Sequence, residues 1–189
     1  MEALFTSTAL VALAEIGDKT QLLAIVLASR LKRPLPIVAG IFCATVANHA
    51  LAAFVGSEAA AFLQADWFRI LIALSFIAMG LWTLVPDTLD PGDEPKRRGG
   101  AFVITLVSFF LVEMGDKTQL ATIALGARFQ NVAAVTAGTT LGMMLANVPA
   151  VFMGNALIKR VPMRMVRLLA ALLFVAIGAW MLIASLTGR

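Results

Sequence analysis

Six long apolar runs constrain the fold more than any other feature of this chain. They cover about 3–29, 35–56, 68–86, 101–127, 132–154 and 166–187 of the 189 residues. A helix needs about 20 apolar residues to cross a bilayer, and each run is near that length. Backbone groups in lipid must pair within their own segment, and the runs lack the alternation of barrel strands. The sequence therefore predicts an all-α, polytopic membrane protein with six transmembrane helices.

The composition excludes two other classes of protein. Apolar residues make up 60% of the chain and charged residues only 14%, with a mean hydropathy of +0.91, which excludes a soluble domain. The pI near 9.8 does not indicate a nucleic-acid partner, because the basic residues outside the runs lie at loops and run ends, where membrane topology explains them. A single cysteine, Cys43, excludes an internal disulfide and a cysteine-based metal cluster.

The two halves of the chain repeat each other. A shift of 98 residues superposes EIGDKTQL, which begins at Glu15, on EMGDKTQL, which begins at Glu113, with seven of eight positions identical. The same shift pairs Trp82 with Trp180, along with several glycines and arginines. Such matches are not expected by chance between two apolar chains, so the sequence predicts a duplication. We expect a three-helix repeat over 1–86, a linker over 87–100 and a second repeat over 101–189.

An odd number of spans per repeat predicts that the two repeats are inverted in the membrane. Inverted repeats are typical of transporters whose substrate binds near the bilayer midplane. Two of the 15 Lys and Arg residues lie deep inside the runs; of the other thirteen, which lie in loops or at run ends, ten lie at the linker side and three at the opposite side. The positive-inside rule then predicts a cytoplasmic linker, with both termini outside.

Charged residues inside the first and fourth runs require an explanation. They are Glu15, Asp18 and Lys19 in the first run and Glu113, Asp116 and Lys117 in the fourth. A charge at the centre of a membrane helix costs about 2.5–3.5 kcal/mol on insertion scales. On continuous helices each set would share one face, and the two faces could meet. Four carboxylates and two ammonium groups sum to −2, which a divalent cation would cancel. Gly17 and Gly115 could also let each helix break beside the site.

Three alternatives to a cation transporter were weighed against the same residues. A structural ion-pair network, with Glu15–Lys19 and Glu113–Lys117 pairs, leaves the second acid of each repeat unpaired in the membrane. A passive cation channel remains open, although this charge density favours tight occlusion over rapid conduction. An intramembrane metal-dependent enzyme is disfavoured, because the sequence has no Ser/His or zinc constellation. We therefore expect a transporter and not an enzyme.

The duplicated Glu-φ-Gly-Asp-Lys-Thr motif resembles the signature of the transmembrane protein 165 family, a group of cation/Ca2+ exchangers that includes bacterial manganese exporters. The resemblance covers nearly the whole chain. It implies transport of Mn2+ or Ca2+ in exchange for protons, with Glu15, Asp18, Glu113 and Asp116 as the metal ligands and no other cofactor. Eukaryotic relatives often carry an amino-terminal extension, so we expect a prokaryotic plasma membrane.

Further polar residues in the runs could support such a site. They are Thr20, Gln21, Asn48, His49, Thr118, Gln119 and Asn147. Carboxamide oxygens and a neutral imidazole could complete the shell of Mn2+, or these side chains could form only interhelical hydrogen bonds. The threonines and glutamines could line an ion path or cap a break in a helix. Lys19 and Lys117 are expected to offset part of the negative charge. The sequence does not decide between Mn2+ and Ca2+, and it leaves the oligomeric state open.

Overall fold

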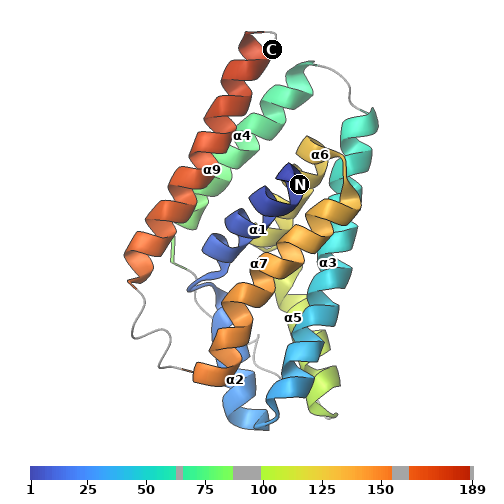
Figure 1. The fold of residues 1–189 in the computed structure, drawn as a ribbon, viewed down its shortest axis with the longest axis vertical. Coiled ribbons are helices and arrows are strands. Elements are labelled where there is room, and N and C mark those ends of the chain that lie inside the picture. Colours follow the sequence, from blue (N-terminus) through green and yellow to red (C-terminus); the bar gives the residue numbers. More distant parts are fainter. Residues whose placement is uncertain (63–65, 87–98, 155–161, 188–189) are drawn as a thin grey trace.

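A computed structural model of the chain describes residues 1–62, 66–86, 99–154 and 162–187 (Figure 1). Every regular element among these residues is a helix, as the sequence predicts. The helices are α1 (Glu2–Glu15), α2 (Lys19–Leu31), α3 (Pro34–Phe62), α4 (Asp66–Thr83), α5 (Ala101–Glu113), α6 (Lys117–Phe129), α7 (Val132–Met153) and α9 (Met163–Leu186). Most of the expected linker, residues 87–98, lies outside the described residues.

Two of the six apolar runs form a broken helix in place of a continuous one. The first run is divided into α1 and α2, and the fourth into α5 and α6. Gly17 has a φ of +84° and Gly115 a φ of +78°, a backbone conformation that residues with a Cβ rarely adopt. The expectation that each charged set shares one face of a continuous helix is therefore wrong. The helix stops at the glutamate and restarts at the lysine because the glycine between them turns the chain.

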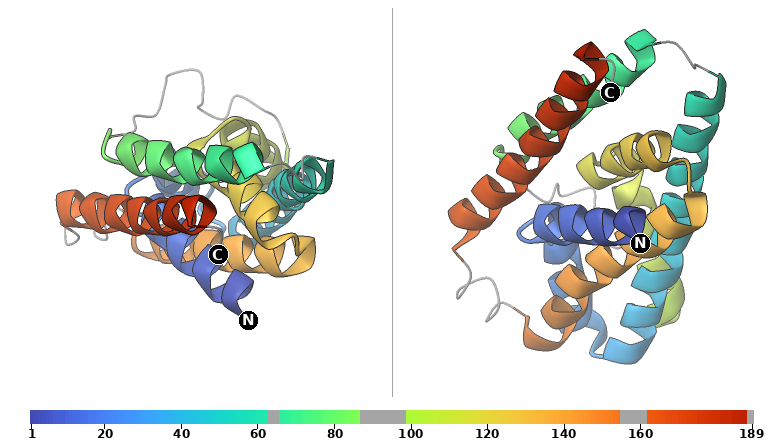
Figure 2. Two further views of the ribbon diagram at one scale, coloured as in Figure 1. Left: turned by 90° about the horizontal axis from the view of Figure 1, so that it is seen from above. Right: turned by 45° about the horizontal axis from the view of Figure 1, so that its top comes forward.

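The two halves interlock in space. Helix α7 packs against α1 and α2 of the first half, while α3 packs against α5 and α6 of the second half. Helices α4 and α9 pack mainly against each other, and Figure 2 shows this pair lying along one side of the molecule. Each broken helix therefore lies against the long helix of the other half. This arrangement brings the two copies of the motif together at the centre.

The helix bounds follow the 98-residue repeat. Helices α2 and α6 begin and end at positions that differ by 98, and α3 and α7 begin at positions that differ by 98. In Figure 1, α3 rises from the lower to the upper end of the molecule, and α7 descends. Similarly, α1 and α2 descend from the amino terminus, whereas α5 and α6 ascend. Corresponding helices of the two halves thus run in opposite directions in this view.

The polarity of the molecule suits a lipid environment. Large apolar side chains such as Leu51, Phe54, Leu145 and Trp180 are more than half exposed, whereas the four motif acids and Asn147 are buried. Among the described residues, three helices are long and apolar enough to cross a membrane, namely Pro34–Ala60, Val132–Met153 and Arg164–Leu186. Trp67–Thr83 and Ala101–Glu113 are shorter apolar helices. The chain is therefore built as an integral membrane protein, with its polar groups inside.

Close backbone contact joins α3 to α6. A methyl group at Gly56 would lie 2.0 Å from the carbonyl oxygen of Ile123, and one at Gly126 would lie 2.4 Å from that of Ala53. Small residues let membrane helices approach in this way, so that van der Waals packing and short polar contacts replace the hydrophobic effect as the cohesive force. The contact holds α6 at a fixed distance from α3.

We expect Gly56→Ala to lower the free energy of unfolding by about 1–3 kcal/mol, because the added methyl group must displace backbone. Thermal unfolding of the detergent-solubilised protein measures this. Gly100→Ala is the matched control, since nothing lies within 4 Å of a methyl group there. Equal melting temperatures for the two variants would contradict the close approach of α3 and α6.

Candidate metal-binding site

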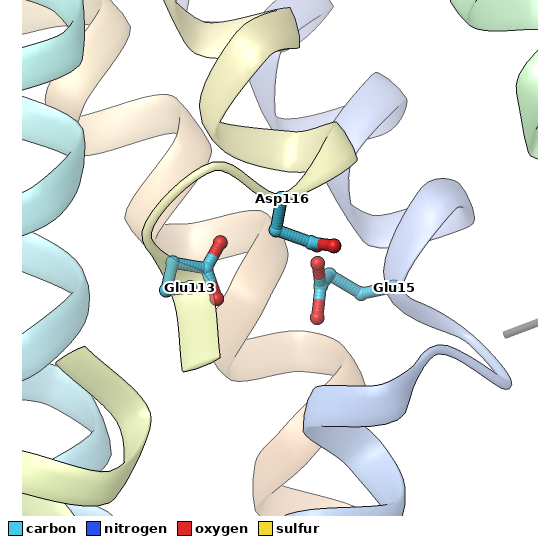
Figure 3. Close-up of side chains that lie close together, drawn as sticks. All are labelled: Glu15, Glu113 and Asp116. Atoms are coloured by element: carbon cyan, nitrogen blue, oxygen red, sulfur yellow. The ribbon is translucent and has the colours of Figure 1, made fainter. Parts of the chain in front are cut away.

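Three carboxylates from both halves of the chain meet at the centre of the molecule. One carboxylate oxygen from each of Glu15, Glu113 and Asp116 lies within 4.8 Å of the other two. The three side chains point toward one another from the ends of α1, α5 and α6 (Figure 3). All three are buried, with exposures of 0%, 1% and 4%. We refer to these three residues as the carboxylate cluster.

The helix breaks position the carboxylate cluster. Glu15 is the last residue of α1 and Glu113 the last of α5, while Asp116 precedes the first residue of α6. The Asp116 N–H donates to the Glu113 carbonyl at 3.1 Å, so one tight turn carries two of the three carboxylates. The glutamines cap the breaks, because Gln21 Oε1 accepts from the Gly17 N–H at 2.9 Å and Gln119 Oε1 from the Gly115 N–H at 2.6 Å. Both glutamines thus make the contacts expected of caps at the helix breaks.

Threonines of the motif hold the glutamates. The Thr20 hydroxyl donates to Glu15 Oε2, and the Thr118 hydroxyl donates to Glu113 Oε1 at 2.6 Å. Thr118 also lies 3.3 Å from Asp116 Oδ2. Each threonine is in the first turn of the helix that follows the break. The motif therefore fixes its own glutamate across its own break, in both halves.

Polar groups from the long helices contact the glutamates of the opposite half. His49 Nε2 on α3 lies 3.3 Å from Glu113 Oε1, and Asn147 Nδ2 on α7 donates to Glu15 Oε2 at 3.4 Å. His49 and Asn147 are 98 residues apart, so equivalent positions of the two repeats make equivalent contacts. The site is consequently shared, because neither half supplies all the groups around its own glutamate.

One lysine compensates part of the charge of the cluster. Lys19 Nζ lies 3.1 Å from Asp116 Oδ1, and thus forms an ion pair between the two halves. When ionised, three carboxylates and one ammonium group sum to −2. The cluster therefore has the charge of −2 that the sequence indicates. It consists of three acids and one lysine, in place of the expected four acids and two lysines.

The remaining residues expected at the site lie around this cluster. Asp18 is buried at the start of α2 but does not belong to the group of three carboxylates. Lys117 Nζ donates to the Val85 carbonyl at 3.1 Å and lies 5.6 Å from the centre of the Trp82 ring. Asn48 Nδ2 donates to the Phe110 carbonyl at 3.0 Å, which is the interhelical role considered for it.

Two features of the site have little signal in the sequence. Met143 places its sulfur 2.9 Å from Asn147 Nδ2, and an apolar residue in an apolar run gives no hint of this contact. The Lys19–Asp116 ion pair crosses between repeats, whereas the i,i+4 spacing favours partners within one repeat. The sequence indicates that the charged faces of the two repeats could meet, but not which lysine pairs with which acid.

Several buried oxygens around the cluster lack a hydrogen-bond donor among the described residues. They are Glu15 Oε1, Glu113 Oε2, Asn48 Oδ1 and Asn147 Oδ1. A buried acceptor without a donor costs about 1–3 kcal/mol, so such atoms call for a ligand. Carboxylate and carboxamide oxygens are hard ligands that suit Mg2+, Ca2+ and Mn2+. The arrangement therefore provides both the charge and the donor atoms for a divalent cation.

Buried carboxylates at the junction of two interlocked halves, inside a membrane bundle, define a transporter-like protein for divalent cations. Sequence comparison agrees with this class. The profile of the family described as "Divalent cation/proton antiporter GDT1" matches residues 3–91 and again residues 101–189. The chain belongs to this family, which is the one indicated by its duplicated motif. The family consists of antiporters, and so differs from both the channel and the enzyme alternatives.

Individual relatives are similar along most of their length. A protein of Vibrio cholerae named "Putative manganese exporter" is 49% identical over 175 residues, which cover 92% of this chain and 87% of the relative. GDT1-like protein 5 of Arabidopsis thaliana is 30% identical, with 91% of each chain covered. GDT1-like protein 5 of Oryza sativa subsp. japonica is 28% identical, over 91% of this chain and 90% of the relative. No solved structure matches the chain.

We expect His49→Leu to lower the free energy of unfolding by about 1 kcal/mol, because Glu113 loses one polar partner in a buried site. His49→Gln is the matched control, since its amide has a similar reach and can donate to the same oxygen. Thermal unfolding in detergent compares the two variants. A stability loss of the same size in both would show that packing, and not the polar contact, is the role of His49.

Proposed function

We propose that this protein exports Mn2+ across a prokaryotic plasma membrane in exchange for protons. The observation that carries the proposal is the carboxylate cluster, whose three acids and one lysine leave a charge of −2 in a buried site. A bound divalent cation cancels this charge without further groups. In this proposal Mn2+ is the substrate of the protein and not a resident cofactor.

Competition for oxygen atoms supplies the coupling between cation and proton. Glu15, Glu113 and Asp116 can hold either a divalent cation or protons, but the same oxygen cannot hold both. A buried site of charge −2 is unfavourable in low dielectric, so one or the other must be present. Protons that arrive from the outside down their gradient then displace the cation, which leaves to the outside.

Alternating access follows from the exchange of roles between the two repeats. Asp116 belongs to the cluster here and pairs with Lys19, whereas its repeat equivalent, Asp18, does not belong to it. In the other access state we propose that Asp18 takes the place of Asp116 and Lys117 that of Lys19. Asp18 is then a ligand in the second state, which gives all four acids of the motif a role. The inverted arrangement of the two three-helix repeats, each with three spans, underlies this exchange.

The choice of Mn2+ over Ca2+ rests on three observations. The Vibrio cholerae relative carries manganese in its name and is 49% identical to this chain. His49 lies against Glu113 in the cluster, and an imidazole nitrogen is a better ligand for Mn2+ than for Ca2+. The buried sulfur of Met143 adds a soft atom beside Asn147, which also disfavours Ca2+.

We expect Glu113→Gln to slow Mn2+ transport driven by a pH gradient in proteoliposomes by at least about 100-fold, because it removes one of the charges that the bound cation compensates. The measurement is Mn2+ uptake under an imposed pH gradient, with Ca2+ in parallel. Glu58→Gln is the matched control, since Glu58 is an exposed acid on α3. Asp18→Asn is expected to behave like Glu113→Gln, because Asp18 serves the second state. Wild-type rates in Glu113→Gln would contradict the proposed site.

A single cysteine tests the orientation. We expect Gly99→Cys, in a Cys43→Ala background, to resist an impermeant thiol reagent in intact cells and to react in inverted vesicles. Gly99 is exposed beside the linker, on the side that carries ten of the thirteen basic residues outside the runs. Modification in intact cells would reverse the proposed orientation, with both termini then inside.

A further inference from the structure

Four polar or soft side chains follow one face of α7 toward the carboxylate cluster. They are Thr136, Thr140, Met143 and Asn147, spaced by four, three and four residues. This spacing places them one above another on a helix, and eleven residues span about 16 Å. Asn147, the last of the four, donates to Glu15 in the cluster. We call these four residues the α7 stripe.

The two threonines of the α7 stripe differ from five other helical threonines and resemble Thr45 on α3, whose buried hydroxyl also has no hydrogen-bond partner among the described residues. Hydroxyls of Thr8, Thr83, Thr105, Thr122 and Thr139 donate to the carbonyl four residues earlier. By contrast, the hydroxyl oxygens of Thr136 and Thr140 are buried and have no hydrogen-bond partner among the described residues. Thr140 is only 4% exposed. A buried hydroxyl without a partner costs about 1–3 kcal/mol, which water would recover.

The unpartnered oxygens of the α7 stripe lie on the same helix as an unpartnered oxygen of the site. Asn147 Oδ1 and Glu15 Oε1 are also buried without a hydrogen-bond donor among the described residues. Unpartnered oxygens thus recur along α7 at Thr136, Thr140 and Asn147, and then reach Glu15. Water needs two to four polar partners to be held in a protein interior, and successive oxygens along one face supply them.

The equivalent face of α3 has only the inner part of such a series, because Thr45 Oγ1 and His49 Nδ1 are also buried without a hydrogen-bond partner among the described residues. A shift of 98 residues places Val38, Phe42, Thr45 and His49 at the positions of the α7 stripe. Val38 packs against an apolar cluster that contains Leu23, Ile37 and Ile41. The positions of Thr136 and Thr140 are therefore apolar in the first half. The two repeats therefore differ in the residues that precede His49 and Asn147 along the long helices.

We propose that the α7 stripe lines a hydrated path that connects the carboxylate cluster to the side of the membrane at which α7 begins. The inference rests on the proposed function, because protons and the divalent cation are the species that would use the path. In the orientation given above, that side is the outside. Water at the threonine hydroxyls carries protons to Glu15, and the cation leaves by the same route.

Cysteine accessibility tests the path directly. In a Cys43→Ala background, we expect a charged, membrane-impermeant methanethiosulfonate to modify Thr136→Cys and Thr140→Cys from the side of the α7 amino-terminal end. Thr139→Cys is the matched control, because Thr139 is buried and its hydroxyl bonds its own helix. Only a thiolate reacts, and a dry site disfavours it, so Thr140→Cys should react at least about tenfold faster than Thr139→Cys. Equal rates would overturn the proposal.

A second comparison remains informative if a cysteine variant folds poorly. Thr140→Val removes the hydroxyl at nearly constant volume and should slow Mn2+ transport about fivefold, while Thr140→Ser should restore it. Equal transport by the valine and serine variants would count against the path. Failure of the proposed function would give a different result from failure of the path. If the Cys43→Ala protein moves no Mn2+ but Thr140→Cys is still modified, the path stands and the assigned substrate is wrong.

Discussion

The concentration of negative charge where the two halves meet is the constraint on which the rest of the structure depends. Three buried carboxylates within 4.8 Å of one another repel strongly in a low-dielectric interior. The protein offsets part of this repulsion with Lys19 and with hydroxyl, amide and imidazole groups. The helix breaks, the interlocked halves and the close approach of α3 to α6 all serve to hold these groups in place. A site that keeps a charge of −2 is suited to a divalent cation that enters and leaves.

Division of the site between the two halves has a functional consequence. Each glutamate is held by a threonine of its own motif and is contacted by the long helix of the other half. Relative movement of the halves therefore changes the surroundings of both glutamates together. The repeats are not identical at this point, because Asp116 belongs to the cluster and Asp18 does not. Such an asymmetry is what a transporter built from two equivalent repeats needs in any one access state.

The high cost of polar groups inside a membrane explains why the buried polar residues of this protein are few and lie together. Apolar side chains cover the outside, and polar groups are collected inside, where each must be paired or hydrated. The caps at Gly17 and Gly115 satisfy backbone groups that the helix breaks expose. Among the described residues, unpartnered oxygens remain at the cluster and along α7, and also at Ser7 and Thr45. In this interior an unsatisfied polar atom is costly, so its persistence points to a ligand, an ion or water.

The sequence by itself determined the helical class, the duplication, the acids of the site and the family, because long apolar runs and charges inside them have few physical explanations. The two glutamates and Asp116 were predicted as ligands and lie together. The tertiary structure decided which groups meet. It pairs Lys19 with Asp116 across the halves, leaves Asp18 outside the cluster and places His49 and Asn147 on opposite glutamates. Sequence spacing could not give these contacts, because a positive φ at Gly17 and Gly115 breaks the helical periodicity that such arguments assume, and contacts between halves depend on packing distant in the chain.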